Sequence, residues 1–272
     1  MIDIGGKLLL LGAGNMGGAM LEGWLKLGLD PAQVAALDPR PPERIAGLIS
    51  ASGVALNPDL STFGTPAVVL LAVKPQMMEA AMPSIAPIVS PTTLIVSIMA
   101  GKTVAGIGRD LPAGIPIVRS MPNLPAAVGR GVTGAFANKS VTPAQKAVAQ
   151  ALLSGIGSVE WVDDEALIDA VTGVSGSGPG YVFYFVEALA KAGVAAGLPE
   201  DLAMRLARGT VAGCGEMLHR SSESAESLRK SVMSPNGTTV AGLNVLMGPS
   251  GIEPFVVGAV AAATKRAGEL AN

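Results

Sequence analysis

The chain is poor in cysteine, histidine and aromatic residues, and each shortage excludes a class of function. Its 272 residues include one cysteine, Cys214, and one histidine, His219, with aromatic residues at 3%. A single cysteine cannot build a disulfide framework or a cysteine zinc site, and we expect no metal. A histidine-based triad would have to use His219, which lies near the end of a predicted helix and suits the helix dipole better than catalysis.

Charge is scarce as well. Charged residues make up 15% of the chain, and 19 basic against 21 acidic residues give a net charge of −2. Because no basic run is present, we expect neither a nucleic-acid partner nor a membrane partner. Two uncharged stretches, 80–101 and 231–252, contain prolines that break a membrane-spanning helix. The N-terminus carries neither a basic signal region nor a cleavage site, so we expect a cytoplasmic protein.

Short apolar runs alternate with segments of helical composition through the first half of the chain. The run ending at Leu11 is followed by Met20, Leu21 and Trp24 at helical spacing. This alternation predicts a Rossmann-type α/β fold with a doubly wound parallel sheet over residues 1–162. The predicted strands are Lys7–Leu11, Val34–Leu37, Val68–Val73, Thr93–Ser97, Pro116–Arg119, Val132–Phe136 and Ser158–Val162.

The second half has almost only helical composition, and we expect an all-α domain over residues 163–272. One helix starts near Gly178, and the next runs from Pro199 to about His219. A polar stretch at 221–227 follows, and two more helices end the chain. These helices carry few charges and many Ala and Gly residues. Such a surface is too apolar for a free monomer, so we expect oligomerisation through this half.

The sequence Gly12-x-Gly14-x-x-Gly17 lies between a predicted strand and a predicted helix. This is the context of a dinucleotide-binding motif, in which glycines allow a tight turn and the helix N-terminus holds the pyrophosphate. Asp38 ends the next strand about 20 residues on, where an acidic side chain binds a ribose 2′-hydroxyl and favours NAD. Arg40 is suited instead to the 2′-phosphate of NADP, so these residues leave the cofactor choice open.

Three further segments end predicted strands at the same carboxyl edge, where ligands bind in such sheets. The small residues after Ser97 leave room for a nicotinamide ring. Lys74 and Arg119 each have a structural alternative, as a solvated lysine and as a cation that satisfies loop carbonyls. The segments are Ala72-Val73-Lys74-Pro75, Ser97-Ile98-Met99-Ala100-Gly101 and Arg119-Ser120-Met121-Pro122-Asn123.

The helical half contains two turns rich in glycine and hydroxyl side chains. Ser175–Gly180 begins a predicted buried helix, where glycines allow close approach of a backbone or a ligand. The segment 234–239, Ser-Pro-Asn-Gly-Thr-Thr, offers main-chain N–H donors and hydroxyls that suit a small carboxylate without any arginine. The alternative is ordinary N-capping of the next helix by Ser234 or Thr238.

These motifs occur in the order found in pyrroline-5-carboxylate reductases, and the chain resembles that family over essentially its whole length. The resemblance implies reduction of 1-pyrroline-5-carboxylate to L-proline by NADPH, with NADH as an alternative, in the last step of proline biosynthesis. It also implies a homodimer at least, through interlocked C-terminal helices, or a larger ring, with the substrate site shared between subunits. The matching motifs are Gly12–Gly17, Ala72–Pro75, Ser97-x-x-Ala100-Gly101, Arg119-x-Met121-Pro122-Asn123, Thr172-Gly173-x-Ser175-Gly176-Ser177-Gly178-Pro179 and Ser234-Pro235-x-Gly237-Thr238-Thr239.

The resemblance also assigns roles by position. Thr239 matches the hydroxyl that bonds the ring nitrogen of the substrate, and we expect it to be the catalytic group. Ser231, Ser234, Gly237 and Thr238 are the expected substrate-binding residues. The expected cofactor-binding residues are Gly12, Ala13, Gly14, Asn15, Met16, Gly17, Asp38, Arg40, Asn57, Ala72, Val73, Lys74, Pro75, Ser97, Ala100 and Gly101.

The chain departs from the family's pattern at several positions, and other functions stay open. The family usually has two glycines where this chain has Asn236-Gly237, and usually alanine at Gly180. One alternative is a Rossmann-type reductase of another cyclic imine. Another is a β-hydroxyacid-type dehydrogenase, which needs a helical-domain lysine such as Lys191 or Lys230. The third is a cofactor-sensing or scaffold protein without turnover, against which the intact 234–239 segment speaks.

Overall fold

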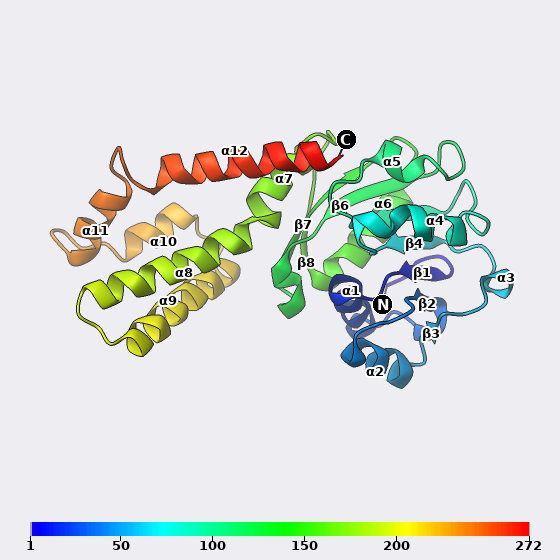
Figure 1. Ribbon diagram of the computed structural model, residues 1–272, viewed down its shortest axis with the longest axis horizontal. Helices are drawn as coiled ribbons and strands as arrows, with labels where there is room; N and C mark the ends of the chain where they lie inside the picture. The colour runs from blue at the N-terminus through cyan, green and yellow to red at the C-terminus, as the bar shows by residue number, and fades with distance from the viewer. Residues whose placement is uncertain (1, 272) are drawn as a thin grey trace. The chain divides into compact units, whose positions relative to one another are not determined.

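The structure is a computed structural model that describes residues 2–271, which form two compact units. The sheet unit comprises the residues up to Gly176 together with those from Ala262 onward, and the helical unit comprises Ser177–Ala261. In Figure 1 the sheet unit runs from blue to green, and the helical unit continues from yellow-green to orange. Each unit is therefore formed by one continuous part of the chain, except that the C-terminal end returns to the sheet unit.

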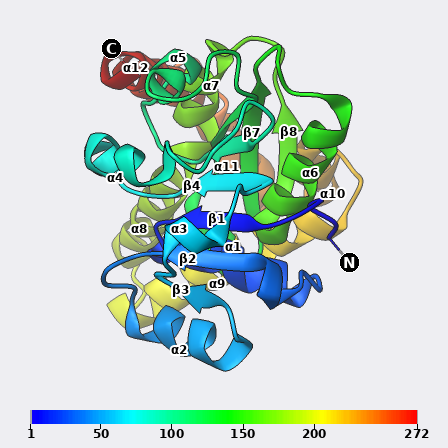
Figure 2. The same cartoon turned by 90° about the vertical axis from the view of Figure 1, so that its right-hand side faces the viewer.

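One eight-stranded sheet organises the sheet unit, in the order β3-β2-β1-β4-β5-β6-β7-β8 (Figure 2). The strands from β3 to β6 are parallel, β7 is antiparallel to β6, and β8 is parallel to β7. The direction in which strands are added reverses between β1 and β4, which is where such sheets bind ligands. The strands are β1 Leu8–Leu11, β2 Val34–Leu37, β3 Ala55–Leu56, β4 Val68–Leu71, β5 Leu94–Ser97, β6 Ile117–Met121, β7 Gly131–Ala137 and β8 Gly157–Trp161.

The Rossmann-type fold class is confirmed, but the expectation of a wholly parallel sheet is wrong for β7 and β8. The link from β6 to β7 covers residues 122–130 and contains only the short 3₁₀ turn Leu124–Val128. A parallel connection needs a crossover of about a dozen residues or more, usually a helix. The short link therefore returns the chain in the opposite direction.

Both faces of the sheet are covered. Leu8 and Leu10 belong to one buried apolar cluster, and Leu9 and Leu11 belong to another. Because alternate residues of a strand point to opposite faces, β1 is buried on both. The helices of this unit are α1 Asn15–Lys26, α2 Glu43–Ser52, α3 Leu60–Phe63, α4 Met78–Ile85, α5 Val104–Gly108, α6 Pro143–Leu153, α7 Leu167–Val171 and the end of α12 (Ile252–Ala271), with 3₁₀ turns at Pro31–Gln33, Pro75–Met77, Leu124–Val128 and Ser154–Ile156 and a π-helical turn at Thr172–Gly176.

Helix α1 fixes the position of the glycine-rich loop that precedes it. Its apolar face of Met20, Leu21 and Trp24 is fully buried, as the helical spacing predicts. The indole Nε1 of Trp24 donates to the carbonyl of Leu152 in α6 at 2.7 Å, so this buried polar group is satisfied. Full burial of one large apolar side chain contributes about 1.5–3 kcal/mol, and α1 is therefore firmly anchored.

The helical unit consists of α8 Gly178–Ala195, α9 Glu200–Arg220, α10 Ala225–Ser231, α11 Thr238–Leu246 and the first part of α12. Helices α8 and α9 lie alongside each other (Figure 1). The polar stretch 221–227 is not wholly irregular, because α10 begins inside it. The hydroxyl of Ser224 accepts a bond from the Ser227 amide at 3.1 Å and caps this helix, which the sequence did not predict.

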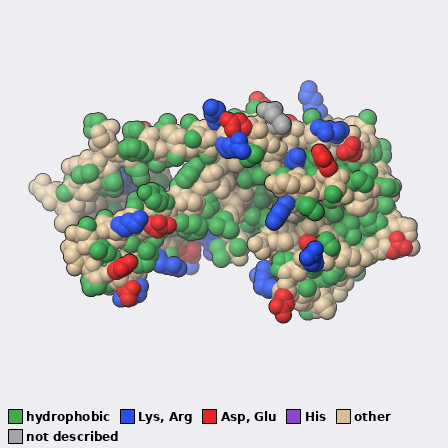
Figure 3. Space-filling view, in the orientation of Figure 1, with side chains coloured by type: hydrophobic (Ala, Val, Ile, Leu, Met, Phe, Trp, Pro, Cys, Tyr) green, Lys and Arg blue, Asp and Glu red, His purple; other side chains and the backbone are tan. Residues whose placement is uncertain are grey.

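The helical unit leaves much of its apolar surface uncovered. Phe183, Tyr184, Phe255 and Val257 are 55%, 67%, 73% and 62% exposed. Figure 3 shows hydrophobic side chains at the surface over these helices. Within the part of the chain that the structure describes, the buried apolar side chains of this unit are small, namely Ala190, Ala203 and Ala207. A surface of this kind is typical of an interface with another protein.

The sheet unit continues past residue 162, where the sequence predicted the first domain to end. Arg119 of β6 forms ion pairs with Glu165, at 3.1 Å, and with Asp169 of α7, at 3.2 Å. These pairs attach α7 to the sheet, and the boundary at 162/163 stays a prediction. None of the helices in residues 2–271 combines the length and apolar character needed to cross a membrane.

Candidate active site

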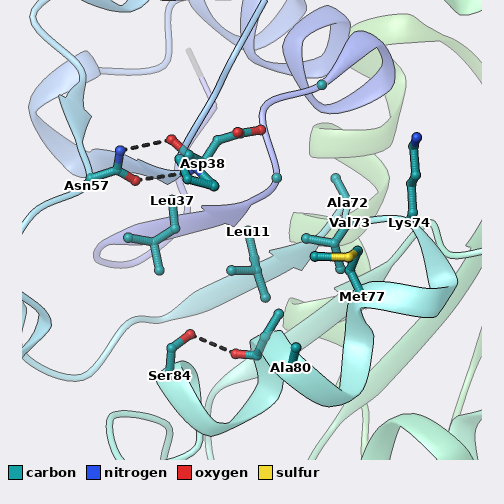
Figure 4. A pocket seen from close by; sticks show the side chains of 14 residues that line it. Leu11, Leu37, Asp38, Asn57, Ala72, Val73, Lys74, Met77, Ala80 and Ser84 are labelled. Carbon is teal, nitrogen blue, oxygen red and sulfur yellow. Dashed lines mark hydrogen bonds between the residues drawn. The ribbon is translucent and has the colours of Figure 1, made fainter.

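A cavity of about 560 Å³ opens at the carboxyl ends of β1, β2 and β4 (Figure 4). It lies where the strand order reverses, next to the glycine-rich loop between β1 and α1. The walls are mostly apolar, which suits the flat faces of a dinucleotide's rings. The lining residues are Leu11, Gly12, Gly14, Leu37, Asp38, Pro39, Asn57, Ala72, Val73, Lys74, Met77, Ala80, Ala81 and Ser84.

Two glycines of the loop are required by close packing. Gly12 has a φ of +95°, and a Cβ on it would lie 2.8 Å from the carbonyl carbon of Ala72. A Cβ on Gly17 would collide with the Gly12 carbonyl oxygen. A Cβ on Gly14 would meet nothing within 4 Å, so its glycine leaves space above the loop. The two close contacts therefore fix the course of the loop, and Gly14 leaves its open side free for a ligand.

The N-terminus of α1 is open to an anion. The cap position is Gly14, and no side chain of the described chain caps the helix there. The first amide groups of a helix lack partners within the helix, and the helix dipole favours negative charge at this end. The loop and helix can therefore hold a pyrophosphate.

The Asp38 carboxylate fastens the glycine-rich loop to the end of β2. Its Oδ2 accepts a bond from the Ala13 amide at 2.8 Å, and its Oδ1 accepts one from the Arg40 amide at 2.9 Å. Both oxygens are therefore engaged by main-chain donors of the protein itself. The Arg40 side chain is exposed and has no ion pair within residues 2–271, so its guanidinium is available to a ligand.

Asn57 lies against Asp38 at the same end of the cavity (Figure 4). Its Oδ1 accepts from the Asp38 amide at 2.9 Å, and its Nδ2 donates to the Asp38 carbonyl at 2.8 Å. Asn57 itself has a φ of 49°, which asparagine adopts more readily than most residues. Asn57 thus lies on the cavity wall, and its role as a cofactor ligand stays a prediction.

The structure brings some of the predicted cofactor residues together on the cavity wall. These are Gly12, Gly14, Asp38, Asn57, Ala72, Val73 and Lys74. The others lie outside the lining, namely Ala13, Asn15, Met16, Gly17, Arg40, Pro75, Ser97, Ala100 and Gly101. The roles of both groups as cofactor ligands stay predictions.

Sequence reasoning missed the wall that α4 contributes. Met77, Ala80, Ala81 and Ser84 line the cavity from this helix and the turn before it. They lie in a stretch whose prolines obscured the helix, because Pro83 falls within α4. These residues are spaced three and four apart, as on one face of a helix, and this spacing was the sequence signal that could have identified the wall.

Arg119 and Asn123 turn out to be structural. Arg119 is 4% exposed, and its guanidinium forms ion pairs with Glu165 and Asp169. The structural alternative is therefore the one observed, although the partners of the cation are carboxylates and not loop carbonyls. The Asn123 side chain accepts from the Val132 amide at 2.9 Å and donates to the Ser175 carbonyl at 3.2 Å. Both side chains hold the sheet unit together near its carboxyl edge.

The 234–239 turn begins α11 in the helical unit. Its cap residue is Gly237, whose amide donates to the Ser234 carbonyl at 2.9 Å. No described side chain caps α11, so the alternative of N-capping by Ser234 or Thr238 is not observed. A Cβ on Gly237 would collide with the Ser234 hydroxyl. The first amides of α11 are left open to a ligand's carboxylate.

Two family models match the chain. The model described as pyrroline-5-carboxylate reductase dimerisation matches residues 165–270. The model described as NADP oxidoreductase, coenzyme F420-dependent, matches residues 7–101. Among curated proteins, the pyrroline-5-carboxylate reductase of Pseudomonas aeruginosa is 41% identical over 268 residues, which cover 98% of this chain and 97% of the relative.

Solved structures are similar over the same extent. A pyrroline-5-carboxylate reductase from Coxiella burnetii has a TM-score of 0.91 at 33% identity, covering 98% of this chain and 99% of that one. The Plasmodium falciparum pyrroline carboxylate reductase, solved with NADP bound, has a TM-score of 0.78 at 26% identity, with the same coverage. The similarity spans both units.

Proposed function

The chain belongs to the pyrroline-5-carboxylate reductase family, and from this premise we propose how its own residues perform the reaction. The reaction is the reduction of 1-pyrroline-5-carboxylate to L-proline with NAD(P)H, the last step of proline biosynthesis. The observation that carries the proposal is the cavity lined by Gly12 and Gly14, where the loop's lack of side chains leaves room for a phosphate. When bound there, the reduced nicotinamide supplies the hydride.

The loop from Gly12 to Gly17 and the open amides of α1 would hold the cofactor's pyrophosphate. Leu37, Pro39 and Ala80 would supply apolar walls for its adenosine half. The residues of the loop and of the cavity wall fit a dinucleotide, because the loop has room for its phosphates and the walls have room for a ring. Val73 and Lys74 continue the wall toward the next strand end.

The cofactor is NADPH, and NADH is accepted as well. The carboxylate of Asp38 is engaged by the amides of Ala13 and Arg40, which leaves it less able to receive a ribose 2′-hydroxyl. The free guanidinium of Arg40 is suited to a 2′-phosphate, since arginine pairs with phosphate through several donors. Asp38 keeps its negative charge nearby, and the preference for NADPH is therefore moderate.

The substrate's carboxylate binds the turn that begins α11. Main-chain amides at Thr238 and Thr239, with the hydroxyl of Ser234, supply donors without an arginine. Gly237, whose own amide bonds the Ser234 carbonyl, shapes the turn. Ser231 lies at the end of α10 just before the turn, and its hydroxyl donates to the Leu228 carbonyl at 2.8 Å. Its contribution is therefore to hold the approach to the turn.

Thr239 orients the ring. Its hydroxyl bonds the ring nitrogen, and orientation requires the nicotinamide C4 to come within about 3–3.5 Å of the imine carbon. A protonated imine already carries the proton that the product amine needs. No strong general base is required, which agrees with a chain that has one histidine, at the end of α9.

The chain carries a dimerisation domain, and we propose that it forms a homodimer at least through interlocked C-terminal helices, or a larger ring. The exposed Phe183, Tyr184, Phe255 and Val257 support this proposal, because a partner's helices would cover them. The cytoplasmic location expected from the sequence stays a prediction.

The hydroxyacid dehydrogenase alternative lacks a supporting observation. Lys230 is held in an ion pair with Glu226 of its own helix at 2.7 Å. Lys191 lies on α8 beside a cavity with Glu187, Glu200 and Asp201, without a glycine-rich neighbourhood. Neither lysine therefore has the surroundings that chemistry would need.

An oxidation assay tests the function. Purified enzyme is given NADPH or NADH with 1-pyrroline-5-carboxylate, and in parallel with a panel of hydroxyacids and other cyclic imines. We expect nicotinamide oxidation with stoichiometric proline for the first substrate and little turnover for the panel. Turnover of a hydroxyacid alone would support the dehydrogenase alternative, and no turnover with any substrate would support the scaffold alternative.

A further inference from the structure

The loop from Ile98 to Thr103, between β5 and α5, is held at three places. It contains Ala100 and Gly101, which the sequence predicts to lie beside the nicotinamide. At its start the Ser97 side chain is fully buried, and its hydroxyl accepts from the Met99 amide at 3.2 Å. The Ser97 carbonyl in turn accepts from the Ser120 hydroxyl at 2.8 Å. The loop thus leaves the sheet from a fixed point.

The middle of the loop rests on the end of α12. Gly101 has a φ of +68°, and a Cβ on it would lie 2.9 Å from the Leu270 carbonyl oxygen. Both residues belong to the sheet unit. The close approach of the end of α12 therefore explains the glycine at position 101. The neighbouring Ala100 is exposed.

A carboxylate fixes the end of the loop. Glu165 Oε1 accepts from the amide of Val104, the first residue of α5, at 2.7 Å. The same oxygen accepts from Arg119 Nη1 at 3.1 Å, and the Arg119 side chain is 5% exposed. Asp169 Oδ1 forms an ion pair with Nη2, the other terminal nitrogen of the guanidinium, at 3.2 Å. Arg119 thus holds Glu165 in one orientation, and Glu165 holds α5.

We propose that Glu165 is a positioning residue for hydride transfer. Its bond to the Val104 amide fixes the position of the loop from Ile98 to Thr103, which faces the nicotinamide. The proposal rests on the proposed function and on the predicted place of Ala100 and Gly101 beside that ring. Glu165 itself touches neither cofactor nor substrate. Displacement of a positioning element by about 1 Å costs on the order of 100-fold in rate, so one bond to a loop end is enough to matter.

Two matched pairs of variants isolate the bond. Val104→Pro removes the amide donor and keeps the ion pairs, and proline is tolerated at the first position of a helix. Thr103 before it has φ −77° and ψ 160°, which a following proline allows. Val104→Ala keeps the amide and loses the side chain. Glu165→Ala removes both contacts, whereas Asp169→Ala removes one ion pair of Arg119 and leaves the amide bond.

We expect Val104→Pro and Glu165→Ala to lower kcat by about tenfold or more, with the dissociation constant of NADPH changed by less than about threefold. Their deuterium isotope effect with NADPH labelled at the transferred position should rise, since hydride transfer becomes slower. Val104→Ala and Asp169→Ala should keep kcat within about threefold of wild type, even if their melting temperatures fall. Glu165→Gln keeps an acceptor oxygen and should recover most of the turnover.

The proposal is overturned if Val104→Pro turns over like Val104→Ala. It is also overturned if Glu165→Ala and Asp169→Ala lose kcat equally, because a general loss of stability then explains both. If Glu165→Ala does not fold, the two Val104 variants decide alone. Failure of the proposed function is distinguishable, because wild-type enzyme would then fail to form proline in the same assay.

Discussion

The two units of this protein treat their apolar residues in opposite ways. In the sheet unit, Leu8 to Leu11 are 5% exposed or less, and buried apolar clusters cover both faces of the sheet. In the helical unit, Tyr184 and Phe255 are 67% and 73% exposed. The first unit completes its own core, and the second has the surface of one half of an interface. Stability of the second unit should therefore depend on protein concentration.

The units also differ in how they bind charge. The sheet unit offers an open helix end together with the unpaired cation of Arg40, at a loop shaped by close packing. The helical unit offers an uncapped helix end and hydroxyls in the segment 234–239, which contains no lysine or arginine. Under the proposed function, we expect shape and charge to recognise the cofactor's phosphates, and hydrogen bonds to recognise the substrate's carboxylate.

The largest effect is expected from the glycine-rich loop. Gly17→Ala should disrupt the sheet unit, because the added Cβ collides with the Gly12 carbonyl oxygen. We expect a loss of several kcal/mol in the free energy of unfolding, on the order of 3. Gly14→Ala is the matched control, with nothing within 4 Å of its Cβ. It should keep the melting temperature and weaken only NADPH binding, and equal melting temperatures for both variants would contradict this account.

The next effect concerns the interface of the helical unit. Phe255→Lys places a charge on a side chain that is 73% exposed in the single chain. We expect the dimer dissociation constant to rise by about 100-fold or more, measured by analytical ultracentrifugation. Lys265→Ala, on the same helix but in the sheet unit, serves as the control. An unchanged dimer in Phe255→Lys would show that this face is not the interface.

Thr239 tests the chemistry of the helical unit. Thr239→Ala should lower kcat by about 10- to 100-fold, because the ring nitrogen loses its hydrogen-bond partner. The NADPH dissociation constant should stay the same, since the cofactor binds the other unit. Thr239→Ser keeps the hydroxyl and should recover most of the turnover. Wild-type turnover in the alanine variant would remove Thr239 from the mechanism.

Arg40 and Asp38 test recognition in the sheet unit. Arg40→Ala should raise the KM for NADPH by about tenfold and leave the KM for NADH nearly unchanged, because only NADPH has a 2′-phosphate. We expect the nearby carboxylate of Asp38 to weaken the preference for NADPH. A wild-type preference above about 100-fold in kcat/KM would reject that role of Asp38.

The smallest effect is expected at the surface of the sheet unit. The Arg44 hydrogen bond, followed by that of Lys26, lowers the pKa of Glu22. A lowered pKa means stability that is present above the unfolded-state pKa and lost as pH falls through the folded-state pKa. Arg44→Gln should cost about 0.2–1 kcal/mol at neutral pH, since the pair is largely solvated. Urea unfolding at neutral pH and in acid should show the difference shrinking in acid.

Much of the sheet unit could be predicted from the sequence because its signals are local. The apolar runs of β1, β2 and β4 and the glycine motif each lie within a few residues. The antiparallel β7 could not be predicted in the same way, because strand direction depends on what a connection can span. The wall of α4 was obscured by Pro83, which sits inside a helix it would be expected to break.

In the candidate site too, features within one short segment could be predicted from the sequence, whereas contacts between distant residues could not. The turn at 234–239 was evident from its composition. The ion pairs of Arg119 join residues far apart in the chain, and no spacing rule links them to Glu165 or to Val104. Likewise, the bond from Ala13 to Asp38 joins two motif residues, and it became visible only when their main chains were placed.

The most direct test of the central claim is a crystal structure of the assembled enzyme with NADPH and a carboxylated ring analogue of the substrate. The account predicts the analogue's carboxylate on the amides of Thr238 and Thr239, its ring nitrogen at the Thr239 hydroxyl, and the nicotinamide C4 about 3–3.5 Å from the reacting carbon. A 234–239 turn directed away from the nicotinamide in every subunit would contradict it.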